Sequence, residues 1–392
     1  MSAEIDVFDG PKTALLRTYA DKVAVSGTEI VKNPRDYRLE RWLTRELLWN
    51  ESGLVRVRSC GRWAITPDGA VQVRANGASV GYAGLASCGS PWACPVCNMK
   101  IQTVRRLEVG VAISQVVSEG GGGTFGTYTL QHGSKDPLDP LWRSLSACWK
   151  SVLRDWSVKR LKASMLHVGT IRAAEVTHGK NGFHPHLHAV HLFARPVSDD
   201  EASALHIAEL KAWKSAAARL GLRSPSERAQ DLHVIRGNAG EAMADYFTKA
   251  VYQPSEISVG YEMTSTQTKS KTRAKQSRTP WEILDSIRLD GDADDLALWH
   301  HFEQASKGKR AISWTRGLRQ RVGLNVEATD EEIAAAEVGT SEDAGFTITD
   351  WFPIRTQPAL GAQLLAVIKN GNDWQAGRQF CEINGIDITT DL

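Results

Sequence analysis

The 392-residue sequence lacks the features that mark membrane and secreted proteins. No apolar run approaches the roughly 20 residues that span a bilayer, and no signal-peptide pattern opens the chain. A run of four glycines at 120–123 is not followed by Gly-Lys-Ser/Thr, so it is not a phosphate-binding loop of an ATPase. These absences predict a cytoplasmic protein with no helicase motor of its own.

A large net charge is also lacking, but the charge is unevenly distributed. The whole chain has 47 Lys+Arg and 45 Asp+Glu, a formal net charge of +2. Residues 323–392 hold 3 basic and 12 acidic residues, a net of −9, which leaves +11 on residues 1–322. A basic body with an acidic tail favours nucleic-acid binding, although an ordinary soluble surface remains an alternative for the tail and, less so, for the body.

Histidine is scarce, yet three of the 11 histidines fall at 184, 186 and 188. The segment Glu175–Phe193 reads as two strands joined by a turn at residues 179–182, where Gly and Asn tolerate positive φ. The side-chain period of two puts all three imidazoles on one face. Pairing Thr177 with His184 then places Glu175 directly across from His186.

Two imidazoles and a neighbouring carboxylate predict a partly open metal site. The ligands would be His186, His188 and Glu175. This mixed nitrogen and oxygen set suits Mg²⁺ or Mn²⁺, and it would also hold Zn²⁺ or Ni²⁺ in vitro. The alternative is a polar, solvated strand face on which the histidines are incidental.

Cysteine is also sparse, and four of the six cysteines lie between residues 60 and 97. Cys94-Pro-Val-Cys97 is a tight knuckle that presents two thiolates to one tetrahedral ion, and Cys60 and Cys88 can supply two more. We therefore predict a structural Zn²⁺ site. The alternatives are a redox pair or buried free thiols. The preceding Val55-Arg-Val-Arg58 alternates like a strand.

Helical patterns with basic side chains suggest contacts to a phosphate backbone. A helix is expected over 100–117, with Arg105 and Arg106 available to DNA, and another over 138–162. Residues 261–280 form a polar segment that reads as a flexible basic linker, for which a merely solvated linker is an equal alternative. Its candidate DNA-binding residues are Lys269, Lys271, Arg273, Lys275 and Arg278.

A further helix is expected from residue 240 until Pro254 stops it. Tyr246 and Lys249 are three residues apart and share a face, whereas Tyr252 lies well round the helix. Taken alone, this pair is best explained as a core tyrosine beside a surface lysine.

In this order, the motifs resemble the rolling-circle plasmid replication initiators, or Rep proteins, of the HUH endonuclease superfamily. The similarity is closest to the actinobacterial-plasmid type and covers roughly residues 55–340. It is carried by the cysteine segment 88–97, Thr127-Tyr-Thr-Leu-Gln-His132, the histidine hairpin and Tyr246-x-x-Lys249. Segments 278–284 and 313–319 extend it.

The resemblance assigns roles to residues of this chain. It implies that His186 and His188 are metal ligands, that Glu175 is the acidic third ligand, and that Tyr246 is the nucleophile. Lys249 would lie beside the scissile phosphate or position the tyrosine. Where some relatives keep a glutamate as the base for termination, this chain has Ala242. The nearby candidate termination acids are Glu241 and Asp245.

The implied function is metal-dependent, site-specific cleavage and rejoining of single-stranded DNA at a plasmid origin. A 5′-phosphotyrosine intermediate would leave a 3′-hydroxyl primer. The implied partners are origin DNA, single-stranded or in a hairpin at the nick site, together with a host helicase and polymerase. A relaxase or transposase of the same superfamily is one alternative. Another is a zinc-stabilised DNA-binding regulator that does not cleave.

The expected fold class is α+β, with an HUH-type antiparallel sheet flanked by helices. We expect a helical arm at 1–53, a zinc-ribbon-like cysteine module at 54–110 and a nicking and joining catalytic domain at 111–260. The basic linker at 261–280 and an α-rich C-terminal region at 281–392 complete the chain.

Overall fold

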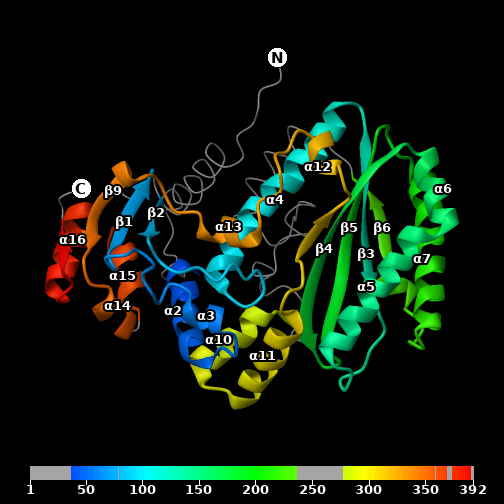
Figure 1. Ribbon diagram of the computed structural model, residues 1–392. Coiled ribbons are helices and arrows are strands. Elements are labelled where there is room, and N and C mark those ends of the chain that lie inside the picture. Colours follow the sequence, from blue (N-terminus) through cyan, green and yellow to red (C-terminus); the bar gives the residue numbers. More distant parts are fainter. Residues whose placement is uncertain (1–36, 78, 236–276, 358, 369–372, 390–392) are drawn as a thin grey trace, which may run out of the picture. The chain divides into compact units, whose positions relative to one another are not determined.

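The computed structural model describes residues 37–77, 79–235, 277–357, 359–368 and 373–389 (Figure 1). Its chain divides into two compact units, one from residues 1–101 and 328–392 and the other from residues 102–327. Both units combine helices with antiparallel strands. None of the helices in the described ranges is long and apolar enough to cross a bilayer.

The first unit is built on a four-stranded antiparallel sheet with the order β10-β9-β1-β2. The strands are β1 (Val71–Asn76), β2 (Ser79–Ala83), β9 (Ala344–Ile348) and β10 (Ile388–Thr389). The helices are α2 (Tyr37–Glu51), α3 (Val55–Ser59), α13 (Asp330–Ala335), η2 (Ser341–Asp343), α14 (Phe352–Thr356), α15 (Leu360–Val367) and α16 (Trp374–Ile383). Trp42, Tyr82 and Phe346 are central to the buried core between sheet and helices.

Two expectations for this part of the chain differ from the structure. Residues 281–392 do not form one region, because β9 pairs with β1 and brings residues 328–392 into the first unit. The predicted strand at residues 55–58 is wrong, since these residues form α3. The helical turn buries Val57 and leaves Val55 exposed. Alternation of valine and arginine over four residues is too short a pattern to distinguish a strand from such a turn.

The second unit contains an antiparallel sheet with the order β6-β3-β5-β4-β7, and β8 pairs with β4. Its strands are β3 (Gly122–Thr129), β4 (His167–Gly179), β5 (Gly182–Phe193), β6 (Asp231–Val234), β7 (Ser277–Arg278) and β8 (Ile312–Trp314). Its helices are α5 (Leu138–Arg154), α6 (Trp156–Ser164), α7 (Asp199–Arg219), η1 (Glu227–Ala229), α10 (Pro280–Asp290), α11 (Ala293–Ser306) and α12 (Leu318–Arg321). Helix α4 (Pro95–Ser118) begins in the first unit and continues into the second.

Helices α5, α6 and α7 lie together against one face of this sheet (Figure 1). The single helix expected over 138–162 is two helices, because Asp155 is extended (ψ 133°) and caps the second one. Its carboxylate accepts hydrogen bonds from the amides of Ser157 (2.9 Å) and Val158 (3.1 Å). The cap therefore ends α5 and restarts the chain as α6.

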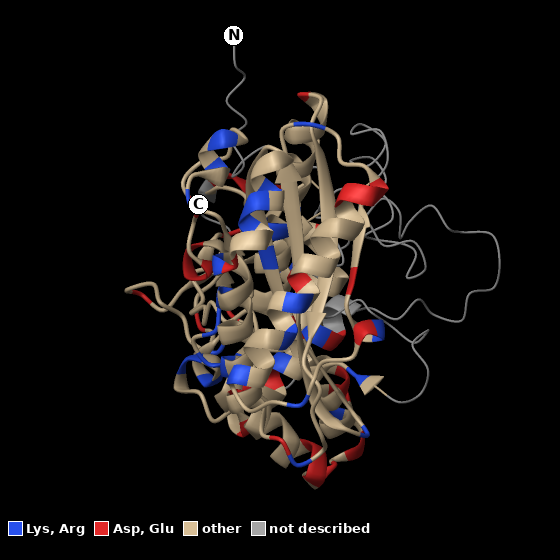
Figure 2. Cartoon of the chain, turned by 90° about the vertical axis from the view of Figure 1, so that its right-hand side faces the viewer, with Lys and Arg blue, Asp and Glu red and all other residues tan. Residues whose placement is uncertain are grey.

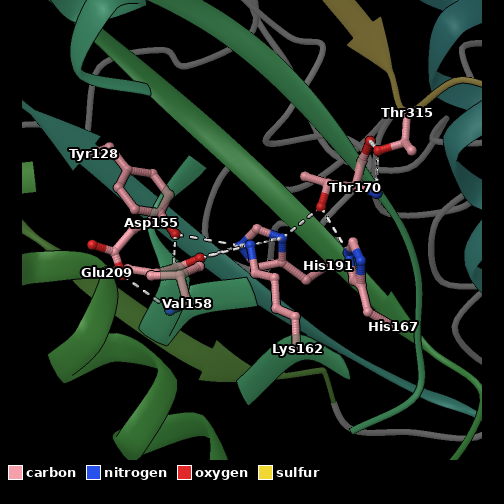
Figure 3. A network of polar contacts seen from close by, with 9 residues as sticks. All are labelled: Tyr128, Asp155, Val158, Lys162, His167, Thr170, His191, Glu209 and Thr315. Atoms are coloured by element: carbon pink, nitrogen blue, oxygen red, sulfur yellow. Dashed lines mark hydrogen bonds and ion pairs between the residues drawn. The ribbon is translucent and has the colours of Figure 1, made fainter. Parts of the chain in front are cut away.

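A buried polar network joins these helices to the sheet (Figure 3). Lys162 Nζ of α6 lies 2.7 Å from Glu209 Oε1 of α7, and the Tyr128 hydroxyl of β3 donates to the same carboxylate. His191 Nε2 of β5 lies 3.3 Å from Glu209, and its Nδ1 lies 2.8 Å from the Thr170 hydroxyl. All five residues are buried, so each polar group depends on its partners.

The charges of this network are mutually dependent. Burial raises the pKa of the Glu209 carboxyl, but Lys162 and His191 together more than offset burial and hold that pKa well below its usual range. Burial and the same ammonium lower the pKa of His191, while burial and Glu209 raise the pKa of Tyr128. At neutral pH, the network is therefore one ion pair with neutral partners around it.

Lys162→Met would leave the Glu209 charge buried without its cation. We expect the free energy of unfolding at pH 7 to fall by about 3–5 kcal/mol, measured by urea denaturation followed by tryptophan fluorescence. Lys159→Met, on the exposed face of the same helix, is the matched control and should change it by less than about 0.5 kcal/mol. Equal effects of the two substitutions would contradict this account of the network.

Candidate metal centres

The β4–β5 hairpin has the register that the sequence predicts. Thr177 pairs with His184 and Glu175 pairs with His186. The strands meet at a tight turn between Gly179 and Gly182, and Gly182 has a φ of 81° that favours glycine. On the other side of β5, β3 pairs with His186 and His188. The register is therefore fixed by neighbours on both sides.

Three buried side chains of this hairpin converge. Glu175 Oε2 lies 3.1 Å from His186 Nε2 and 3.2 Å from His188 Nε2. Their exposed fractions are 3%, 6% and 2%, respectively. The three residues predicted as metal ligands thus form one group whose ligand atoms lie within 4.8 Å of one another.

Contacts behind the ligands orient the two imidazoles. His188 Nδ1 lies 3.3 Å from the Thr127 hydroxyl of β3, and its ring stacks on Phe125 at 5.3 Å and 13°. His186 Nδ1 lies 3.4 Å from the carbonyl oxygen of His184. Both histidines therefore present Nε2 to the carboxylate, and such outer contacts are what fix the rings of metal-binding histidines.

The geometry of the triad fits a divalent cation. Two ligand bonds of about 2.1 Å at right angles bring their donor atoms to about 3.0 Å, close to the two separations between nitrogen and oxygen found here. Two nitrogens and one carboxylate also leave octahedral positions for water or a phosphate oxygen. His186, His188 and Glu175 could therefore hold a divalent metal ion.

The third histidine of the motif belongs to a neighbouring pair. His184 Nδ1 lies 2.7 Å from His132 Nε2, and His132 Nδ1 lies 3.0 Å from the carbonyl oxygen of Asn181. A carbonyl only accepts, so His132 Nδ1 donates to it, and neutral His132 then accepts from His184 Nδ1. His184 is thereby held by its own partner beside the triad.

His132 and Thr127 were not predicted from the sequence as supporting residues. Both lie in the 127–132 segment that carries part of the resemblance. Alternation along β3 contains the relevant signal, because Thr127 is directly across from His188 and Thr129 across from His186. The pairing of β3 with β5 was needed to read this signal.

The four clustered cysteines form a second group. Cys60 Sγ lies 3.5 Å from Cys97 Sγ and 3.7 Å from Cys94 Sγ, and Cys88 Sγ lies 3.6 Å from Cys97 Sγ. All four are buried and none forms a disulfide. Four thiolates at about 2.3 Å from a tetrahedral Zn²⁺ would be about 3.8 Å apart, which these separations approach. The cluster could hold a metal ion such as zinc.

Local backbone geometry brings the cysteines together. Cys60 caps the end of α3, while Cys94 immediately precedes α4 and Cys97 lies in its first turn. Gly61 follows Cys60 and Gly89 follows Cys88, and their φ values are 65° and 60°. The φ of Gly61 favours glycine, and a Cβ there would lie 2.1 Å from the Arg45 guanidinium, which would have to shift.

The four thiols do not share one electrostatic environment. Burial raises the pKa of the Cys94 thiol well above the usual value, whereas hydrogen bonds from the neighbouring thiols lower the pKa of Cys60 and of Cys97. A bound Zn²⁺ would favour the thiolate form of all four, because a coordinating thiol is deprotonated by the ion.

The structure does not present two of the proposed DNA-binding arginines as free surface charges. The Arg105 side chain is 5% exposed and pairs with Glu108 at 3.1 Å and Glu327 at 3.5 Å, which differs from the expectation that it is available to DNA. Arg278 forms two hydrogen bonds to the carboxylate of Asp295, at 2.5 and 2.7 Å. Arg106 is half-buried.

Other predicted site residues lie outside the described ranges. They are Tyr246 and Lys249, Glu241 and Asp245, and Lys269, Lys271, Arg273 and Lys275.

The chain resembles a Streptomyces lividans protein named "Protein rep". The two are 28% identical over 351 residues, which cover 74% of this chain and 77% of that protein. A Streptomyces cyanogenus protein named "Neomycin resistance protein" is 30% identical over 141 residues, 30% of this chain and 32% of that protein. No family model matches, and no solved structure matches.

Cys94→Ala would remove one of four ligands from the cysteine cluster. We expect the purified protein to lose its single equivalent of zinc, measured by atomic emission, and to unfold at a lower temperature. Cys381→Ala is the matched control, because Cys381 is equally buried in the same unit but lies outside the cluster. Zinc retained by the Cys94 variant would contradict the assignment.

His186→Ala would remove one nitrogen ligand from the triad. We expect Mn²⁺ affinity to fall at least tenfold, measured by electron paramagnetic resonance of free Mn²⁺ during titration. His233→Ala changes an exposed histidine of β6 and should leave the affinity unaltered. Unchanged Mn²⁺ binding by the His186 variant would show that the ion does not bind at the triad.

Proposed function

We propose that this protein is a rolling-circle plasmid replication initiator of the HUH type, which nicks and rejoins one strand at the plasmid origin. One observation carries the proposal. Glu175, His186 and His188 converge, buried, on one face of an antiparallel sheet, in a chain similar to "Protein rep" over most of its length. A triad of this composition suits an ion that binds phosphate oxygens.

In the proposed reaction, the Tyr246 oxygen attacks the phosphorus at the nick site. A bond forms from that oxygen to phosphorus, the bond to the 3′-oxygen breaks, and the phenolic proton is lost while the 3′-oxygen gains one. The strand is then held as a 5′-phosphotyrosine, which preserves the bond energy for rejoining. The released 3′-hydroxyl serves as the primer for a host polymerase.

The residues of the sheet have a positioning role. His186, His188 and Glu175 would hold Mg²⁺ or Mn²⁺, and that ion, when bound, supplies positive charge that polarises the non-bridging oxygens of the phosphate. Thr127 and Phe125 keep His188 in its ligating orientation. Lys249 is proposed to lie near the phosphate or the tyrosine, and Glu241 and Asp245 are the candidates for the terminating step.

The cysteine cluster is proposed to hold a structural zinc. Its four thiolates form a closed set that leaves no coordination position for a substrate, so it contributes to folding. A DNA-binding regulator that does not cleave would share this cluster. The triad favours cleavage, because a regulator has no need for a partly open site for a divalent ion.

Tyr246→Phe would remove the nucleophilic oxygen and little else. We expect the intact protein, with Mn²⁺, to cleave a supercoiled plasmid carrying the cognate origin and to remain attached to the 5′ end. The variant should show no adduct on a denaturing gel. Tyr252→Phe is the matched control and should keep the adduct.

The other outcomes separate the alternatives. An adduct formed by the Tyr246→Phe variant would show that another residue is the nucleophile, and Tyr252 would be the first residue to test. Origin binding without cleavage by the intact protein in Mg²⁺ or Mn²⁺ would favour the regulator.

A further inference from the structure

An exposed tryptophan lies among cations where α5 meets α6. Trp156 is the first residue of α6, and its exposed fraction is 69%. Lys159 and Arg160 follow three and four residues later, so they share its face of the helix, and both are exposed. Lys150 and Arg154 are exposed on the last turns of α5. We call these five residues the α5–α6 patch.

The fold holds this patch outward. The opposite face of α6 is anchored to the body of the unit by buried Val158 and by the ion pair of Lys162 with Glu209 (Figure 3). The Asp155 cap fixes where the helix begins. Trp156 therefore cannot turn inward without breaking the buried network. Its large apolar ring stays in water, beside half-exposed Leu153.

Among the described residues, the acidic side chain nearest in sequence to the cations of the patch is Asp155, and two backbone amides engage its carboxylate. The acidic first turn of α7 adjoins the other end of α6, where Arg195 binds both the carbonyl oxygen of Ser164 and the Glu201 carboxylate. Figure 2 shows blue Lys and Arg positions along the helices on this side of the sheet.

We infer that the α5–α6 patch binds single-stranded nucleic acid without sequence preference. The four cations would contact successive phosphates, and the Trp156 ring offers a face on which an unpaired base stacks. The Arg160 guanidinium lies 5.2 Å from the centre of that ring and strengthens such a platform. A duplex keeps its bases stacked internally, so the exposed ring selects single strands.

This surface is separate from the triad. Residues of β5 alternate between the two faces of the sheet, so the helices over His191 cover the face opposite to His186 and His188. The strand displaced during rolling-circle replication is a natural source of such DNA, and this link alone depends on the proposed function.

The test is binding of a fluorescein-labelled 20-nucleotide oligo(dT), which has no nick site, measured by fluorescence anisotropy without Mg²⁺ or Mn²⁺. Trp156→Ala should weaken binding by about tenfold. Lys159→Ala/Arg160→Ala should lower the slope of log affinity against log salt by about 1.4, the value for two phosphate contacts on a single strand. The exposure of these side chains predicts unchanged thermal stability.

The matched control is Lys307→Ala/Arg310→Ala. It removes the same two charge types from exposed positions near the start of α5, where Lys309 pairs with Asp139. This variant should bind oligo(dT) like the intact protein. If the patch variants also bound like the intact protein, the inference would be overturned. Poly-glutamate serves as a probe for an acidic protein partner. If the patch variants lost binding to poly-glutamate but kept binding to oligo(dT), the inference would be overturned in favour of such a partner.

Origin cleavage at saturating substrate separates this inference from the proposed function. Trp156→Ala should retain the cleavage rate, because the patch does not contact the reacting phosphate. Weak oligo(dT) binding by Trp156→Ala, together with a normal cleavage rate, would support both the nucleic-acid-binding patch and the proposed function. Absence of cleavage by the intact protein, with oligo(dT) binding that depends on Trp156, would reject the proposed function and leave the patch in place.

Discussion

The pairing of β4 with β5 is the constraint on which both faces of the second unit's sheet depend. In this register, Glu175 faces His186 and lies next to His188. A slip of one residue would turn Glu175 to the helix-covered face and dissolve the triad. The same register sets Thr170 against His191 and thereby completes the network beneath α6 and α7. One hairpin thus positions the Glu175–His186–His188 triad on one face of the sheet and the buried polar network beneath α6 and α7 on the other.

Short-range information was sufficient to predict this hairpin. Two glycines and an asparagine located the turn, and alternation then determined which side chains faced each other. The gathering of Cys60, Cys88, Cys94 and Cys97 was also predictable, because a Cys-x-x-Cys knuckle with further cysteines nearby is typical of a metal site. Alternating histidines across from a glutamate, and cysteines in a Cys-x-x-Cys knuckle, have few roles other than metal binding.

Longer-range features were not predictable. The Lys162–Glu209 pair joins residues 47 positions apart that read as ordinary surface charges of two amphipathic helices. The break at Asp155 depends on an extended residue within a continuous apolar pattern. The strand predicted at residues 55–58 was wrong for a similar reason, because the burial of Val57 in the first unit depends on tertiary packing that the local sequence does not reveal.

The acidic C-terminal segment shows how position along the chain misleads. It reads as a separate tail, yet β9 lies between β1 and β10 at the centre of the first sheet. Part of its charge is paired within that unit, through Glu337 with Arg74 at 2.9 Å and Glu331 with Arg56 at 3.1 Å. The excess of acidic residues in this segment is therefore partly balanced by basic residues of the first unit. A count along the sequence overstates the separation of charge.

The most direct test of the account is a crystal structure of the Tyr246→Phe protein with Mn²⁺ and an uncleaved origin oligonucleotide. Anomalous scattering at the manganese and zinc edges would locate each ion. The account predicts manganese bonded to Nε2 of His186, Nε2 of His188 and the Glu175 carboxylate, with the scissile phosphate on its open side. Zinc should lie among the four cysteines. Manganese elsewhere, or DNA bound with its nick site away from the triad, would contradict the central claim.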